Sequence, residues 1–143
     1  MRTFFILIFT FFIFSFSYGQ IRYLKDENEL REMADKTTRL FKEMKFHEMY
    51  SYMKNYWPIP EAEIDNLENQ TKSISLVILP RYGSTVGYLK LKEQRLKDFA
   101  IKITYIVLFE KHAVRITYIF YNSGKGWILN SFKWDDNFKE EFE

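Results

Sequence analysis

The strongest structural signal in this chain lies in residues 99–122, which read FAIKITYIVLFEKHAVRITYIFYN. Apolar and aromatic side chains occupy alternate positions on both sides of a charged break, the spacing of strands with one buried face. The buried sets that this spacing predicts are Phe99, Ile101, Ile103, Tyr105, Val107 and Phe109, then Val114, Ile116, Tyr118 and Phe120. Lys111 and His112 are predicted to form a tight two-residue turn, which makes the segment an antiparallel hairpin. Such a turn sets Tyr105 opposite Tyr118, Ile103 opposite Phe120 and Val107 opposite Ile116.

Two further strands are predicted to flank this hairpin. Residues 85–96 alternate weakly and carry several Lys and Arg residues, which is typical of an edge strand. Residues 122–126, NSGKG, indicate a turn. The last strand is expected over 127–135, and a charged tail follows it over 136–143.

The residues before these strands predict helices, because their apolar side chains recur every three or four positions. The expected helices are 26–44, 45–57 and 61–79. Asp26 is a suitable N-cap, and Glu29 completes a capping-box-like start. Pro58 and Pro60 end the second helix. The third, which Pro80 and Gly83 close, has the apolar stripe Ile64, Leu67, Thr71, Ile74 and Ile78. Helices followed by antiparallel strands predict one α+β domain over 20–143, with the helices covering one face of a curved four-stranded sheet.

Residues 1–19 have the three parts of a signal peptide. A basic start at Arg2 precedes an almost unbroken Phe, Ile and Leu run over 4–16, and Ser17-Tyr18-Gly19 offers a cleavage site before Gln20. An uncleaved membrane anchor is the alternative, but its apolar stretch would need about 20 residues. We therefore expect a periplasmic or secreted protein that meets the membrane only through this leader.

The composition excludes several classes of function. The chain has no cysteine, so disulfides, thiolate metal sites and a cysteine nucleophile are ruled out. Its formal net charge of +2 does not indicate the concentrated basic surface that binds nucleic acid. The chain has two isolated histidines and no glycine-rich phosphate loop. We therefore predict no metal site and no cofactor.

The order of elements and the ending GWILNSF, residues 126–132, resemble the nuclear-transport-factor-2-like superfamily of α+β cones. A Trp that opens the last strand after a Gly-rich turn is common in its small exported members. The resemblance implies that the helix-covered sheet face lines a conical pocket, in which enzymatic members carry an Asp or His as general base. The inward positions of the three central strands hold no Asp, Glu or His. His112 is expected in a turn and His47 on the second helix, so no catalytic residue is assigned.

Two candidate sites follow from these faces. The pocket candidates are Tyr50, Tyr56, Trp57, Tyr105, Tyr118 and Asn130, which either bind a small apolar ligand or form a packed core. The candidates on the open face are Ile106, Leu108, Arg115, Thr117, Ile119 and Tyr121, an apolar patch rimmed by charge.

The open face is expected either to bind a protein partner or a second copy, or to be covered by the chain's own tail. The superfamily often dimerises through it. The preferred hypothesis is a non-enzymatic exported domain that binds through this face. A carrier of a small apolar ligand is the alternative, and an isomerase or hydrolase with an unrecognised site is a third.

Overall fold

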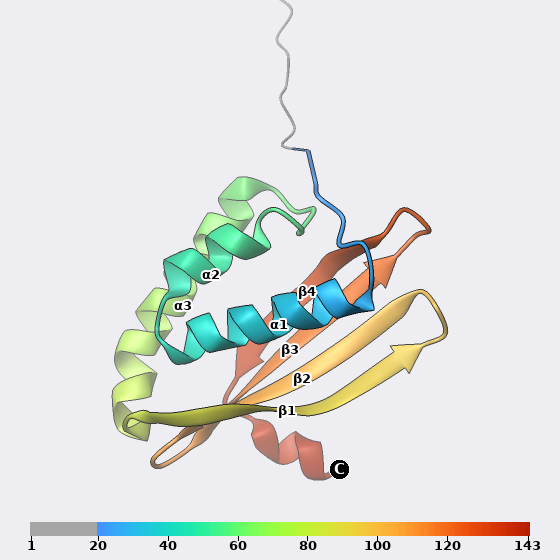
Figure 1. Cartoon of the computed structure of the whole chain (residues 1–143). Coiled ribbons are helices and arrows are strands. Elements are labelled where there is room, and N and C mark those ends of the chain that lie inside the picture. Colours follow the sequence, from blue (N-terminus) through green and yellow to red (C-terminus); the bar gives the residue numbers. More distant parts are fainter. Residues whose placement is uncertain (1–19) are drawn as a thin grey trace, which may run out of the picture.

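The computed structural model describes residues 20–143, and the predicted signal peptide over 1–19 lies outside the described residues. The helices are α1 (Glu27–Lys42), α2 (Phe46–Met53) and α3 (Glu61–Tyr82), and the strands are β1 (Thr85–Leu96), β2 (Ala100–Phe109), β3 (Ala113–Asn122) and β4 (Trp127–Asp135). A short 3-10 helix, η1 (Phe138–Phe142), follows. The strands pair antiparallel in the order β1-β2-β3-β4, and the helices pack on one face of that sheet (Figure 1). The predicted α+β class is confirmed.

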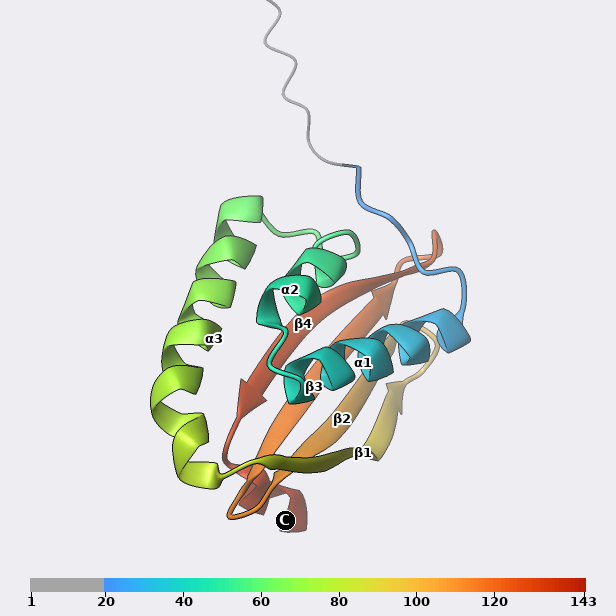
Figure 2. The same ribbon diagram turned by 60° about the vertical axis from the view of Figure 1, so that its left-hand side comes forward.

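The helices differ in how they meet the sheet. The turned view shows α1 lying across the sheet, whereas α3 runs beside the edge that β4 forms (Figure 2). Within residues 20–143, none of the helices combines the length and the apolar character needed to cross a membrane.

The predicted register of the central hairpin is wrong by two residues. Tyr105 lies opposite Ile116, and Ile103 lies opposite Tyr118. Phe109 N donates to His112 O at 2.9 Å, so the two-residue turn is 110–111. This turn leaves the charged pair Glu110 and Lys111 exposed while Phe109 stays buried. Because a shift of two preserves the alternation, the strand side chains keep their predicted faces.

The core lies between α1, α2 and the inner sheet face. From α1 it takes Leu30, Met33, Ala34, Thr37, Leu40 and Phe41, and from the central strands Ile101, Ile103, Tyr105, Val107, Val114, Ile116, Tyr118 and Phe120. Met44, the last residue of the predicted first helix, instead follows α1 in a left-handed turn and is 40% exposed. Phe99, predicted inward, is 46% exposed because β2 begins one residue later.

The buried line of α3 differs from its predicted stripe. It consists of Ile64, Glu68, Thr71, Ser75 and Leu79. Ile74 is 43% exposed, and the helix continues through Pro80 to Tyr82. The prediction followed apolar side chains, whereas polar ones on the buried line find hydrogen-bond partners and are accepted there.

An ion pair fastens α1 to the edge strand β1. Arg31 Nη2 lies 2.7 Å from Glu93 Oε1, and Arg31 Nε lies 3.1 Å from Glu93 Oε2. These hydrogen bonds lower the pKa of Glu93 to about 2, against the opposing effect of partial burial. Lys90 adds a further hydrogen bond to this carboxylate.

This pair predicts a defined loss of stability in acid. A carboxylate with a lowered pKa stabilises the fold above its unfolded pKa, here about 4.5, and that contribution falls away as the pH drops toward 2. We expect Glu93→Gln to lose less stability than the parent chain between pH 6 and pH 3, by on the order of 1 kcal/mol. Urea unfolding of both proteins at the two pH values measures this difference. Equal losses would show that Arg31 does not hold this carboxylate ionised.

The N-terminal segment is tied to the start of the last strand. Leu24 N donates to Trp127 O at 2.8 Å, and Trp127 N donates to Leu24 O at 2.9 Å. Gly126 has a φ of 122°, and a Cβ there would lie 2.9 Å from the Cβ of Tyr23. Both the backbone conformation and this close approach therefore require glycine.

Candidate functional site

The inner sheet face is filled by its own aromatic side chains. Tyr118 is fully buried, and its ring lies 6.2 Å from that of Tyr105 and 5.4 Å from that of Phe132. Its hydroxyl oxygen lies 2.8 Å from Thr37 Oγ1 and 2.9 Å from Thr38 Oγ1. Burial raises the pKa of Tyr118. The hydroxyl is thus satisfied inside the core and is not directed at an open cavity.

The other predicted pocket residues differ in burial and do not lie together. Tyr50 and Trp57 are buried against Phe132, with ring distances of 5.8 and 6.3 Å. Tyr56 is half-buried and contacts another tyrosine. Asn130 is exposed, at an irregularity in the pairing of β4. The structure therefore brings the buried aromatic residues together and leaves Asn130 apart.

Thr71 holds α3 to the rest of the core. Its Oγ1 lies 2.7 Å from the Tyr50 hydroxyl and accepts from Trp134 Nε1 at 3.0 Å. Burial raises the pKa of Tyr50 to about 12, so the hydroxyl stays neutral and able to donate. One side chain of α3 thereby joins α2 and β4.

The outer face of the sheet is covered at one end by η1. Arg115 Nη2 contacts Asp135 and Glu140 at 2.9 Å, and Arg115 Nη1 contacts Glu141 at 2.9 Å. Lys92 also pairs with Glu141. Ile106, next to Arg115 in the register, is only 7% exposed as a result. These carboxylates raise the pKa of Arg115, which keeps its charge.

The opposite end of the outer face is uncovered and apolar. Leu96 is 64% exposed and Tyr121 is 39% exposed, while Ile119 lies half-buried near them. A shallow hollow of about 260 Å³ lies here, lined by Gln94, Leu96, Ala100, Ile101, Lys102 and Ile119. Of the other residues predicted on this face, Leu108 and Thr117 are half-buried. The predicted patch is thus divided into a covered end and an open end.

The charge of the outer face is predominantly basic. Its described charged side chains are Lys92, Lys102, Arg115 and Lys133, with Asp135 opposing them. The tail that covers one end is acidic and carries two phenylalanines, as its sequence DNFKEEFE over 136–143 shows. The face and its cover are therefore electrostatically complementary.

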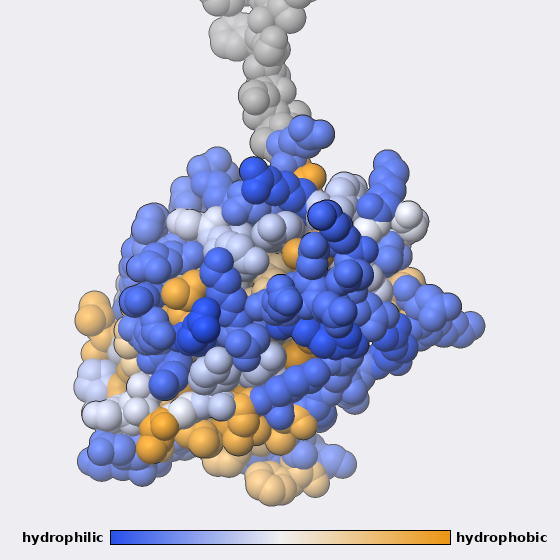
Figure 3. All heavy atoms as spheres, viewed as in Figure 1, coloured by the Kyte–Doolittle hydropathy of each residue, from blue (hydrophilic) through white to orange (hydrophobic). Residues whose placement is uncertain are grey.

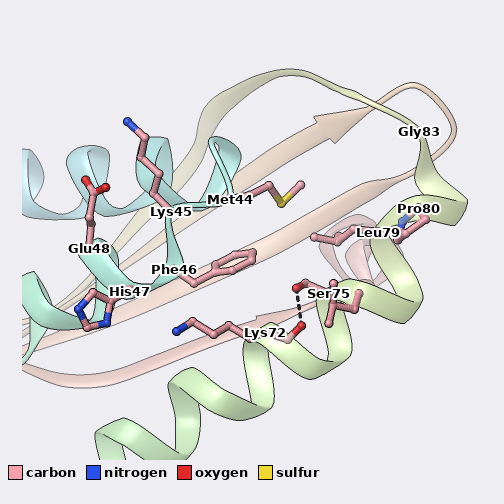
Figure 4. A pocket seen from close by; sticks show the side chains of 11 residues that line it. Met44, Lys45, Phe46, His47, Glu48, Lys72, Ser75, Leu79, Pro80 and Gly83 are labelled. Atoms are coloured by element: carbon pink, nitrogen blue, oxygen red, sulfur yellow. Dashed lines mark hydrogen bonds between the residues drawn. The ribbon is translucent and has the colours of Figure 1, made fainter.

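Sequence reasoning missed a groove between the corner that joins α1 to α2 and the second half of α3. Its volume is about 780 Å³, and its apolar lining includes Met44, Phe46, Leu76, Leu79 and Pro80 (Figure 4). The polar side chains Lys45, His47, Glu48 and Lys72 lie toward one end. The available signal was the run SISLVIL over 73–79, in which no residue is charged.

Several polar groups of the groove already have partners, namely His47, Lys72, Ser75 and Lys45. His47 Nδ1 lies 2.9 Å from Glu68 Oε1, which also pairs with Lys72. Lys72 and His47 lower the pKa of Glu68 against the opposing effect of burial. Ser75 Oγ donates to Lys72 O at 2.8 Å. Among residues 20–143, no three potential metal ligands come together.

The chain was compared with known proteins at three levels. Models of protein families, curated proteins and solved structures gave no match.

Proposed function

We propose that this chain is an exported, non-enzymatic interaction domain of the nuclear-transport-factor-2-like cone type. It binds an acidic segment with aromatic side chains, presented by a protein partner, on the outer face of its sheet. The sequence of residues 1–19 supports export, and the element order and the ending GWILNSF support the cone type. The observation that carries the binding proposal is the contact between η1 and Arg115.

The tail is an intramolecular example of such a ligand. Two of its glutamates, Glu140 and Glu141, contact one guanidinium, an arrangement that favours charge-assisted hydrogen bonds. None of the residues of η1 is fully buried, and Phe142 is 86% exposed. The tail is therefore held mainly by charge, and a longer segment with the same chemistry would add contacts that the tail lacks.

The open end of the face supplies those additional contacts. Lys102 and the hollow beside Leu96 continue the basic and apolar character beyond the region that η1 covers. A segment that extends past Arg115 would meet Tyr121 and Ile119 there. Aromatic side chains in apolar hollows, ringed by polar groups, are where binding energy concentrates in protein interfaces.

Two other functions have less support. If a second copy docked on this face, Lys102 and Arg115 would face the basic residues of that copy. Repulsion between these like charges costs free energy. A carrier of a small apolar ligand would need room on the inner face, where Tyr118 and Phe132 pack against each other. Self-association through the sheet and an aromatic-lined cone are thus the weaker proposals.

Binding of the tail in trans tests the proposed function. We expect a chain that ends at Asn137 to bind the synthetic peptide DNFKEEFE, with an affinity that falls as salt rises. Arg115→Ala in the same shortened chain should weaken binding by about tenfold, because a charge-assisted contact is lost. Fluorescence anisotropy of the labelled peptide provides the measurement.

A peptide in which glutamine replaces the two glutamates that contact Arg115, Glu140 and Glu141, serves as the matched control. It keeps the phenylalanines but should bind no better than the Arg115→Ala protein binds the parent peptide. If the two peptides bind equally well, or neither binds, the outer face does not recognise acidic segments.

A further inference from the structure

Between Ile74 and Leu79, α3 carries apolar side chains on its outward side as well as toward the core, and Ser75 is the one polar residue among them. Leu79 is buried, whereas Leu76 is 78% exposed, Val77 is 60% exposed and Ile74 is 43% exposed. A helix segment with apolar side chains all round is expected to be covered on all sides. Within residues 20–143, nothing covers the outward side of this segment. We call Ile74, Leu76 and Val77 the α3 ridge.

The α3 ridge stands directly beside the groove described above. Leu76 lines the groove and also belongs to the ridge. Across the groove lie Met44 and Phe46, at the corner between α1 and α2 (Figure 4). Apolar side chains gather at the lower left of the molecule, where α3 ends (Figure 3). A projecting apolar ridge and an apolar hollow therefore share one surface.

A surface that carries both a ridge and a matching hollow is self-complementary. A twofold axis would place the ridge of each copy in the groove of the other, which is how an isologous dimer interface is built. A small ligand in the groove would instead leave Val77 and Ile74 exposed to water. The charged groups at the groove mouth are also already paired, Lys72 with Glu68 and Lys45 with Glu43, so they do not select a ligand headgroup.

The charges around the groove agree with a second copy as its occupant. Lys45 and Lys72 are basic and Glu48 is acidic on this rim, and both lysines already pair with glutamates of their own copy. A rim with balanced charge does not repel its own image, unlike the basic outer sheet face.

We propose that two copies of this chain associate through their α3 ridges and α3 grooves. Leu76 of one copy packs against Met44 and Leu79 of the other, and the reverse contact forms by symmetry. The surface is separate from the outer sheet face, so this proposal does not depend on the function proposed above.

Analytical ultracentrifugation of residues 20–143 tests the association. We expect a dimer in the micromolar range and a dissociation constant raised about 100-fold or more by Leu76→Glu, because a carboxylate would be buried without a partner. Leu96→Glu is the matched control, since it is an equally drastic change at an exposed leucine, and it should leave the dimer intact. Circular dichroism should show that Leu76→Glu folds normally, because its side chain is 78% exposed in one copy.

Cross-linking tests the geometry, and the chain has no cysteine to interfere. A mixture of Met44→Cys and Leu76→Cys proteins should form a disulfide between the two variants faster than either protein does alone. A monomeric parent chain at 100 µM overturns the proposal. So does a monomer that sediments with vesicles of phosphatidylethanolamine and phosphatidylglycerol, because the ridge would then be a lipid-binding surface. Equal loss of the dimer in Leu76→Glu and Leu96→Glu would also overturn it.

Discussion

Tyr118→Ala is expected to lower the free energy of unfolding by about 4 kcal/mol, the range found for removal of large buried rings. The ring is fully buried on the inner sheet face, between Tyr105 and Phe132. Its removal leaves a cavity that α1 and the sheet cannot both close, because each is held by further contacts. Urea denaturation monitored by tryptophan fluorescence measures the loss.

Tyr118→Phe separates the ring from its hydroxyl group. It should cost only about 1 kcal/mol, because Thr37 and Thr38 also donate to Met33 O and Ala34 O at 2.8 Å and remain satisfied. If Tyr118→Ala cost no more than this control, the ring would border free space. A small apolar ligand in an aromatic-lined cone would then become the better proposal.

Thr71→Val is expected to cost about 2 kcal/mol, because it removes the one hydroxyl group that two other polar groups share. The buried Tyr50 hydroxyl and the half-buried Trp134 indole N–H would both lose this hydrogen-bond partner. Valine matches threonine in shape, so packing is preserved and the loss reports on hydrogen bonding. Thermal and urea unfolding of the same variant should agree.

Thr71→Ser is the matched control for this change. Serine keeps the hydroxyl and loses a methyl group, so the expected cost is about 1 kcal/mol. If valine and serine destabilise the chain equally, the hydroxyl is not what fastens α3. Thr71→Val should also weaken the association between α3 ridges, because it loosens the helix that carries them.

Most of the fold could be predicted from the sequence because its signals are local. The alternation in 99–122 specifies two strands and their buried faces, and Asp26 caps α1 as expected, accepting from Asn28 N at 2.9 Å. The turn was misplaced because neither candidate pair contains the Gly or Asn that usually marks a two-residue turn. Both registers keep the same side chains buried, so the alternation alone could not choose between them.

The sites were harder to predict because they depend on how elements meet. The outer face was found, since alternation places Ile106 and Ile119 opposite the core, and cover by the tail was an open alternative. Which end η1 covers depends on the pairing of Arg115 with Glu140 and Glu141, which no local pattern specifies. The groove arises from the angle at which α3 leaves the core. The uncharged run 73–79 did indicate that apolar side chains would not be confined to one face of this helix.

The bridge between Leu24 and Trp127 has a consequence for how the chain folds. It joins the first described residues to the last strand, so the native arrangement closes only when nearly all of the chain is present. Contacts between the two ends of a chain slow folding, because the entropy of closing the loop is lost before the contacts form. The pairing of Leu24 with Trp127 is therefore expected to form late, after β4 is available to the folding chain.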